Sequence, residues 1–288
     1  MTGLPERRII DDMAAQPAAV ARLTIRELSA LGDLEAVYDL FDRIWRPDRS
    51  NPPVTVEHLR ALTHAGNYVA GAFDGDQLIG ACVGFFAAPP GRSLHSHVAG
   101  VSSAARGRHV GFALKAHQRE WALAHGLSEI TWTFDPLVRR NAYFNLAKLQ
   151  ARPSDYLVDF YGDMDDAING GQGSDRLLTR WRLDVPEVVA ACAAGGGAAA
   201  AVPPGAVAAL TESASGRPVV APRSAWARAS LLTVATPPDI EALRGADPDL
   251  ARQWRGAMRD VLGELVGGGA RVTGFTRSGA YVVERTDA

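Results

Sequence analysis

The chain of 288 residues is 47% hydrophobic and carries a formal net charge of −2 at pH 7. That length suits one large or two small domains, and the apolar fraction is sufficient for a sizeable core. The near balance of charge and the lack of a long basic run argue against nucleic acid as a partner. No apolar run approaches the roughly 20 residues of a membrane-spanning helix, so no membrane association is expected.

The two cysteines, Cys82 and Cys192, lie too far apart in sequence and context to predict a disulfide framework or a metal site. The N-terminal residues lack the apolar core of a signal peptide. Together these features predict a cytoplasmic protein that binds no metal.

Hydrophobic periodicity and turn residues predict a regular alternation of strands and helices. In chain order the predicted elements are a strand at Leu23–Leu28, a helix capped by Asp33 and stopped by Pro47, a helix at about Thr55–His64, strands at Asn67–Phe73, Gln77–Ala87 and Ser93–Val101, a helix at Val110–His125, a strand at Glu129–Asp135, a helix at Arg139–Leu149, and strands at Asp155–Tyr161 and Leu177–Leu183.

Changes in composition divide the chain into four parts. We predict a flexible leader at 1–21, a first domain at 22–184, an Ala/Gly/Pro-rich linker at 185–228 and a small α/β subdomain at 229–288. About 60 residues are few for an independent domain, so we expect the last part to dock on the first domain or to extend its sheet.

An arginine- and glycine-rich loop joins the strand ending at Val101 to the helix beginning at about Val110. The free N–H groups and the positive dipole end at the start of a helix bind anions, and glycine lets a phosphate approach closely. The run from Arg106 to Gly111 therefore indicates a phosphate-binding loop.

This stretch resembles the pyrophosphate loop of the GNAT acyl-CoA-dependent N-acyltransferases, where a strand ending in valine leads through Arg-Gly-Lys/Arg-Gly-Ile-Gly into a helix. The order of the predicted elements is also the GNAT order. The resemblance implies an α/β fold with a mixed, mostly antiparallel central sheet flanked by helices. It also implies a parallel strand pair that splays to admit the pantetheine arm. The run from Ile130 to Leu137 further resembles a bacterial GNAT subgroup of unassigned substrate.

The resemblance implies which residues would bind the cofactor. They are Val101, Arg106, Gly107, Arg108, His109, Val110 and Gly111 in the loop, with Asn141 or Asn145 against the CoA arm. One position departs from the pattern, because His109 stands where the family has a glycine. A left-handed backbone at His109 would cost on the order of 1 kcal/mol.

Many GNAT enzymes place a glutamate on the strand before the loop as general base, but no carboxylate lies between Gly91 and Ala105. His95 and His97 lie two apart on that strand and hence on one face. Histidine suits proton transfer at cellular pH, so one of them is predicted as the base, with His95 preferred unless a strand bulge reverses the choice. The alternative is a pair of partly buried structural histidines.

Further candidates lie at the far end of the following strand and in the next helix. Asp135 is either a turn or capping carboxylate or an acceptor-amine anchor and alternative base. The family usually has a tyrosine that protonates the departing thiolate, and that position falls on Leu146 here. Tyr143, one turn earlier, is either the acid or a core residue.

The polar loop before the last strand of the first domain is a candidate acceptor-binding segment. Asp175 and Arg176 are predicted to bind the substrate, and Arg176 would bind a carboxylate of that substrate. The aspartates Asp163, Asp165 and Asp166 would bind an amine. The alternative is an ordinary solvated loop.

The resemblance implies an enzyme that transfers an acyl group, with acetyl-CoA as co-substrate, to the amine of a small molecule by direct attack in a ternary complex. Two other interpretations stay open. One is a GNAT-like module that binds acyl-CoA without transfer, and the other is a GNAT-fold enzyme with different thioester chemistry, such as decarboxylation. Whether the C-terminal part covers the active site or makes a homodimer contact also stays open.

Overall fold

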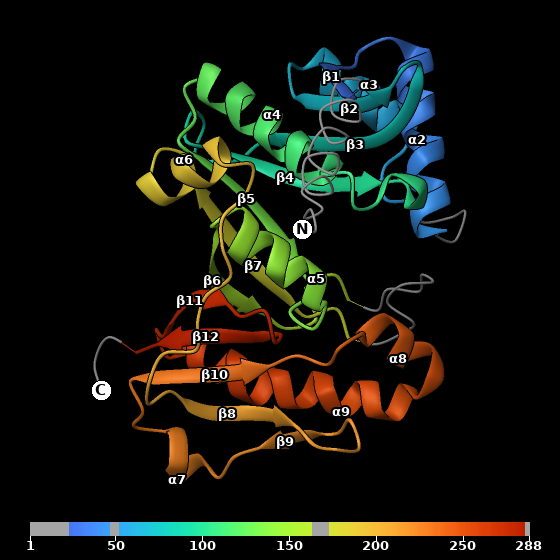
Figure 1. Cartoon of the computed structure of the whole chain (residues 1–288). Helices are drawn as coiled ribbons and strands as arrows, with labels where there is room; N and C mark the ends of the chain where they lie inside the picture. The colour runs from blue at the N-terminus through green and yellow to red at the C-terminus, as the bar shows by residue number, and fades with distance from the viewer. Residues whose placement is uncertain (1–22, 47–51, 163–172, 286–288) are drawn as a thin grey trace, which may run out of the picture.

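A computed structural model describes residues 23–46, 52–162 and 173–285, which build two sheets one above the other in Figure 1. The predicted leader at 1–21 and the aspartates at 163, 165 and 166 lie outside these residues. None of the helices in the described parts is long and apolar enough to cross a bilayer.

The first sheet has seven strands in the order β1-β2-β3-β4-β5-β7-β6, and only the pair β4–β5 is parallel. Its strands are β1 (Leu23–Glu27), β2 (Tyr68–Asp74), β3 (Gln77–Phe86), β4 (Ser93–Val101), β5 (Glu129–Phe134), β6 (Arg152–Leu157) and β7 (Arg176–Arg182). The predicted mixed, mostly antiparallel α/β sheet and the predicted order of elements are confirmed.

Helices cover both faces of this sheet because its strands alternate apolar residues between them. Tyr68 and Ala70 of β2 pack on the α4 side, whereas Val69 between them packs on the side of α2 and α3. The helices of this domain are α2 (Leu31–Trp45), α3 (Val56–His64), the 3-10 helix η1 (Ser103–Ala105), α4 (Val110–Ala124), α5 (Arg139–Ala142) and the π-helical segment η2 (Tyr143–Lys148).

The parallel pair β4–β5 separates after three residues. Ser93, Leu94 and His95 pair with Glu129, Ile130 and Thr131, and no pairing continues toward Val101 and Phe134. On its other edge β5 pairs with β7 along its whole length, Glu129–Phe134, so the sheet stays continuous on that side. The two strands therefore diverge toward the loop after β4, as the resemblance implied.

The second sheet has five strands in the order β11-β12-β10-β8-β9, with β8 and β10 parallel. Its strands are β8 (Val207–Glu212), β9 (Pro218–Val220), β10 (Leu231–Ala235), β11 (Arg271–Phe275) and β12 (Ala280–Glu284). The helix α6 (Pro186–Ala193) packs on the first domain through Val188, and the helices around the second sheet are α7 (Arg223–Trp226), α8 (Ile240–Ala246), α9 (Pro248–Met258), the π-helical segment η3 (Arg259–Gly263) and α10 (Glu264–Gly267).

The stretch 185–228, predicted as a linker, contains two helices and two strands of this second sheet, which corrects the prediction. Its small residues serve close packing. A Cβ added at Gly197 would lie 2.5 Å from the Ala147 carbonyl oxygen, and one added at Gly274 would lie 2.6 Å from the Ala200 Cβ. Gly197 and Ala200 thus allow close contacts with the first domain and with β11, and the last part forms its own sheet instead of extending the first.

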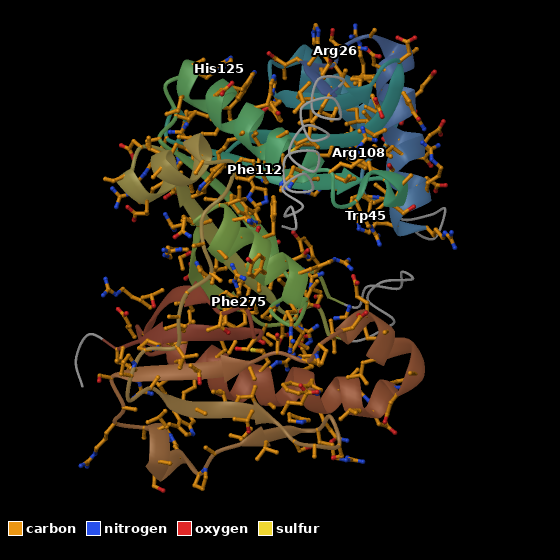
Figure 2. All side chains as sticks on the ribbon, in the orientation of Figure 1. Arg26, Trp45, Arg108, Phe112, His125 and Phe275 are labelled. Atoms are coloured by element: carbon orange, nitrogen blue, oxygen red, sulfur yellow. The ribbon has the colours of Figure 1, made fainter. Side chains whose placement is uncertain are left out.

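The two domains share one apolar core. Phe134, Leu137 and Leu146 of the first domain are buried with Trp254 and Phe275 of the second. Figure 2 shows Phe275 at the junction of the two domains. The Tyr281 hydroxyl donates to the Pro136 carbonyl oxygen at 2.7 Å across the same junction.

A buried ion cluster lies in this interface. The carboxylate of Asp135 accepts hydrogen bonds from both terminal nitrogens of Arg255, at 2.8 and 2.6 Å, and from Arg244 at 2.5 Å. Each of these side chains is at most 7% exposed. Burial acts to raise the Asp135 pKa, but the charges of Arg255 and Arg244 and the Leu137 N–H outweigh it and hold the pKa at about 2.

Asp135→Asn is expected to lower the free energy of unfolding by about 3–5 kcal/mol, because it leaves buried arginine charge uncompensated. Chemical denaturation measures the change. The matched control is Arg252→Gln, which removes an exposed pair with Asp249 and should change stability by less than about 0.5 kcal/mol. Equal small losses in both variants would contradict a stabilising role for the Asp135 cluster.

The same cluster predicts a pH dependence. The folded-state pKa of Asp135 lies below its ordinary value of 3.8, so its contribution to stability is present above about pH 4 and is lost as the pH falls through about 2. Between pH 5 and pH 2, a plot of the free energy of unfolding against pH should therefore have a smaller slope for Asp135→Asn than for the wild type. Equal slopes would contradict the ion cluster.

Candidate active site

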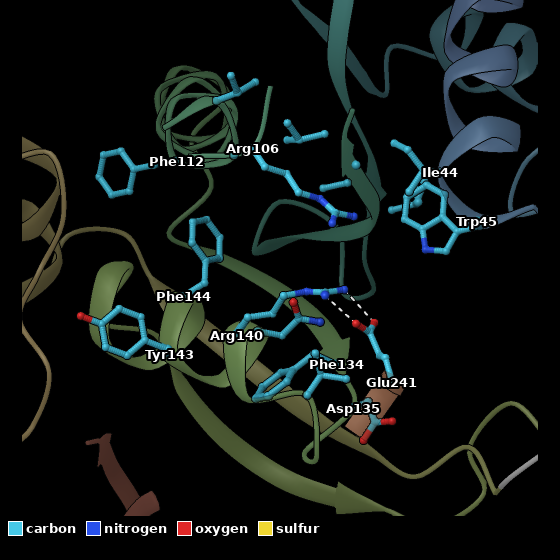
Figure 3. A pocket seen from close by; sticks show the side chains of 18 of the residues that line it. Ile44, Trp45, Arg106, Phe112, Phe134, Asp135, Arg140, Tyr143, Phe144 and Glu241 are labelled. Carbon is cyan, nitrogen blue, oxygen red and sulfur yellow. Dashed lines mark hydrogen bonds and ion pairs between the residues drawn. The ribbon is translucent and has the colours of Figure 1, made fainter. Parts of the chain in front are cut away.

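A cavity of about 1090 Å³ opens where β4 and β5 diverge. Its walls come from α2, the second half of β4, the start of α4, the end of β5, α5 and η2, and from α8 of the second domain. Figure 3 shows it between Trp45, Arg106, Phe112 and the pair Arg140–Glu241. Both domains thus contribute to one cavity.

The start of α4 presents unpaired donors to this cavity. The N–H groups of Val110, Gly111 and Phe112 have no acceptor among the described residues, as expected for the first turn of a helix. A Cβ built on Gly111 would meet only Val101 and Phe144, both beyond 3.7 Å. The first turn of α4 therefore has open space in front of free backbone donors.

The loop before α4 has the conformation that its glycine pattern requires. Gly107 has φ +79° and His109, the N-cap of α4, has φ +58°. His109 thus adopts the left-handed conformation that the family's glycine would adopt without a Cβ penalty. The histidine occupies the glycine's backbone position at some cost in conformational energy.

The structure places most, but not all, of the predicted loop residues on the cavity. The lining residues among them are Val101, Arg106, Gly107, His109, Val110 and Gly111. Arg108 does not line the cavity. It pairs with Asp74 at 2.8 Å on the surface. An arginine, a histidine and free N–H groups therefore converge on the space in front of α4.

His95 and His97 share a face, since both rings lie against Phe85. The pairing of β3 with β4 skips His97, because Val83 is opposite Val98 while Gly84 is opposite Ser96. This bulge is the irregularity that could reverse the predicted preference.

The bulge puts only His97 on the cavity. His97 is exposed, with its Nε2 3.4 Å from the Pro53 carbonyl oxygen. His95 is half-buried, and its Nδ1 lies 3.2 Å from the Thr131 hydroxyl. Burial, together with the nearby charges of His97 and Lys115, lowers the His95 pKa to about 4. His95 is therefore a weak base outside the cavity.

Two predicted acidic site residues are used in the domain interface instead. Asp135 touches the cavity but is held by two arginines, as described above. Asp175 is fully buried and accepts from Arg259, at 3.0 and 2.6 Å, from the Tyr156 hydroxyl at 2.7 Å and from the Asp159 N–H at 3.1 Å. The Arg259 contacts connect Asp175 to the second domain, and Asp175 does not line the cavity, which corrects its prediction as a substrate ligand.

Arg176, the neighbour of Asp175, does line the cavity. It is 7% exposed, and its guanidinium lies over the Tyr161 ring at 5.3 Å and donates to the Asp175 carbonyl oxygen. Burial lowers its pKa. Arg176 thus supplies a buried positive charge to the cavity.

Some of the predicted residues in the helical segment after β5 line the cavity, and others do not. Asn141 and Tyr143 line the cavity, and Phe144 does so beside them. In Figure 3 the Tyr143 hydroxyl points away from Arg106 and toward the outer side of the helix. Asn145 is buried and does not line the cavity, so it is not placed to contact a CoA arm. The π-helical register from Tyr143 to Lys148 puts Lys148 on the cavity as well.

Sequence reasoning missed the residues of the second domain. Glu241 and Arg244 lie on α8, about 100 residues after α5 along the chain, and both line the cavity. Glu241 accepts from both terminal nitrogens of Arg140, at 2.5 and 2.7 Å. No spacing rule connects segments so far apart, so no signal in the sequence could have found this pair.

The cavity suits the phosphates and the arm of an acyl-CoA. Free N–H groups at the start of α4, the open space at Gly111 and the charge of Arg106 match a pyrophosphate. The gap between β4 and β5 gives an extended arm access to strand N–H groups that pair with no neighbouring strand. The residues present therefore fit this co-substrate.

Residues 34–145, which lie within the first domain, match the model of the Acetyltransferase (GNAT) family. The second domain lies outside the matched segment.

Several solved structures resemble the first domain. Ribosomal-protein-S5-alanine acetyltransferase from Vibrio fischeri is 19% identical, and the alignment covers 57% of this chain and 94% of the other, with a TM-score of 0.45. An N-acetyltransferase from Staphylococcus aureus Mu50 is 14% identical over 56% and 99%, with a TM-score of 0.47. The protein yncA from Salmonella typhimurium, solved with its cofactor acetyl-CoA, is 16% identical over 57% and 95%, with a TM-score of 0.45. No curated protein matches the chain.

His109→Gly is expected to raise the free energy of unfolding by up to about 1 kcal/mol, since it removes the Cβ from a left-handed position. Ala104→Gly is the control, because Ala104 is exposed in η1 at negative φ, and it should lose about 0.5–1 kcal/mol. Thermal denaturation compares the two. A loss in His109→Gly as large as in the control would contradict strain at His109.

Proposed function

We propose that this protein transfers an acetyl group from acetyl-CoA to the amine of a small molecule. The observation that carries the proposal is that one cavity joins the free donors of α4, the gap between β4 and β5, and a polar wall from the second domain. The family supports the acetyl-CoA half of this statement. The size and two-domain lining of the cavity support a small acceptor enclosed on several sides.

The reaction is direct transfer in a ternary complex. The amine nitrogen attacks the thioester carbonyl carbon, a C–N bond forms, and the C–S bond breaks. The amine loses one proton to a base, and the departing thiolate takes one proton. Unpaired N–H groups of β4 beyond the divergence from β5 stabilise negative charge on the carbonyl oxygen, and positioning of the two substrates supplies much of the remaining rate.

His97 is the better base of the two strand histidines. It lies at a bulge, is exposed and lines the cavity, whereas His95 lies beside Thr131 off the cavity. Leu146, at the family's tyrosine position, is buried in the apolar core and cannot donate a proton. In this proposal the thiolate takes its proton from water, since a thiolate is a tolerable leaving group.

A non-catalytic acyl-CoA-binding module is the second candidate. The observation in its favour is that β4 has neither aspartate nor glutamate and that Leu146 replaces the family's acid. Binding of acetyl-CoA without release of the thiol for any amine of a broad panel would favour the module over the transferase.

Gly111→Trp is expected to abolish CoA binding, because the indole would fill the space in front of the α4 donors. Gly111→Ala should bind within about tenfold of wild type, since its Cβ meets only van der Waals contacts. Gly267→Trp, at an exposed glycine of α10 with open space around it, controls for the added indole. Calorimetric titration with CoA measures all three, and wild-type binding by Gly111→Trp would refute this binding site.

His97→Asn is expected to lower kcat by about 100-fold, in the range for loss of a general base, while His95→Asn has a smaller effect. Because burial and nearby charge lower the His95 pKa to about 4, His95 as base would give activity that rises through pH 4 and stays level above it. Steady-state rates from pH 4 to 9 separate the two. Wild-type kcat in both variants would exclude a histidine base.

A further inference from the structure

Among the described residues that line the cavity, two carry a carboxylate, Asp135 and Glu241. Asp135 is 7% exposed and bound by Arg244 and Arg255, so it has little capacity left for a ligand. The Glu241 side chain is 24% exposed, and within the described parts of the chain Arg140 is its one partner. Glu241 is therefore the carboxylate available to an incoming amine.

The pair Arg140–Glu241 has an end-on geometry that leaves groups of both partners available. Each terminal nitrogen of Arg140 donates to one oxygen of Glu241, which leaves the Arg140 Nε–H and its outer N–H groups unused by Glu241. Each carboxylate oxygen of Glu241 keeps a second lone pair. In Figure 3 the pair spans the cavity below Arg106, between α5 and α8.

Such a pair is complementary to a ligand that carries both charges. An ammonium binds the free lone pairs of Glu241, and a carboxylate on a neighbouring carbon binds the free edge of Arg140. The four charges then alternate in sign, so neither partner of the protein pair is left uncompensated. A ligand with only one of the two charges satisfies half of this arrangement.

The overall charge of the cavity points in the same direction. Its lining holds five basic side chains, Arg106, Arg140, Lys148, Arg176 and Arg244, against the two carboxylates. Even after a pyrophosphate is bound, this balance disfavours a polycationic acceptor and favours one that carries a carboxylate.

The second domain holds Glu241 in place. The Arg139 guanidinium donates to the Thr236 hydroxyl at 3.2 Å and also to the Thr236 carbonyl oxygen, and the Tyr281 hydroxyl donates to Pro136. These bonds connect α5, which carries Arg140, to the segment that leads into α8, which carries Glu241. The two partners of the pair are thus positioned by the domain interface.

From these observations we propose that the second domain completes the acceptor site and that Arg140 and Glu241 select a zwitterionic acceptor, a small molecule with an amine and a carboxylate on neighbouring carbons. This inference rests on the proposed function, because it concerns the acceptor half of the same cavity. It assigns Glu241 as an acceptor-binding residue contributed by a different domain from the one that binds acetyl-CoA.

The test compares α-amino acids with the matching amines that lack the carboxylate, and with spermidine, in a thiol-release assay with acetyl-CoA. The wild type should prefer amino acids by at least about 10- to 100-fold in kcat/KM, the effect of losing one charged hydrogen bond. Glu241→Gln should raise the acceptor KM by a similar factor and leave the acetyl-CoA KM unchanged. Arg140→Lys, a second variant with the charge retained, should lose the preference for the carboxylate.

Glu264→Gln, at an exposed pair with Arg223 away from the cavity, is the matched control and should behave as wild type. Thermal melting of each variant verifies folding. Equal rates with amino acids and their decarboxylated amines, or an unchanged acceptor KM in Glu241→Gln, would overturn the assignment of the zwitterion site.

Calorimetric titration of the same amino acids into the CoA-bound protein separates failure of the site from failure of the transferase. Amino-acid binding that is lost in Glu241→Gln, without thiol release, supports the site and overturns the transfer reaction. Thiol release from amines that does not depend on Glu241 overturns the site and leaves the transferase intact. If none of these ligands binds and none releases the thiol, both the zwitterion site and the transferase are overturned.

Discussion

The arrangement of both domains depends on one buried carboxylate, Asp135, at the point where β5 ends. Removing a charge from water is costly unless partners replace the lost hydration, and Arg244 and Arg255 do so from two helices of the second domain. These ion pairs therefore connect the first domain to the second. It fixes the end of β5, which is a wall of the cavity, and it places α8 against α5. The diverging strands of the first domain and the polar wall of the second meet where Asp135 finds Arg244 and Arg255, which it contacts only when the domains are docked.

The cavity combines two kinds of recognition that arise from different physics. On the α4 side, recognition comes from the backbone: the first turn of any helix has free N–H groups, and Gly111 keeps the space in front of them open. On the α8 side, recognition comes from side-chain charge, in the pair Arg140–Glu241. Backbone donors need only a loop of the right shape, so they belong to a single segment. The side-chain pair needs two helices held in register, which only a docked second domain can supply.

The first domain was predictable because its signals are local. Apolar alternation in the strands, the turn residues between them and the loop from Arg106 to Gly111 each span few residues. The predictions that failed concern residues whose contacts lie far away along the chain. Asp135 and Asp175 have partners 84 to 120 residues away, so their burial in the domain interface could not be predicted from the sequence. The strands at 207–220 were not predicted because the alanine- and glycine-rich composition around them resembles that of a flexible linker.

The shared apolar core has a consequence for what counts as a unit of this protein. Leu137, Val138 and Leu177 lie in the same buried cluster as Trp254 and Tyr281, although the two sheets are separate along the chain. A boundary near residue 185 therefore separates the two sheets but passes through a shared apolar core. Cutting the chain there would expose a contiguous apolar face with unpaired carboxylates at its centre, a surface prone to aggregation.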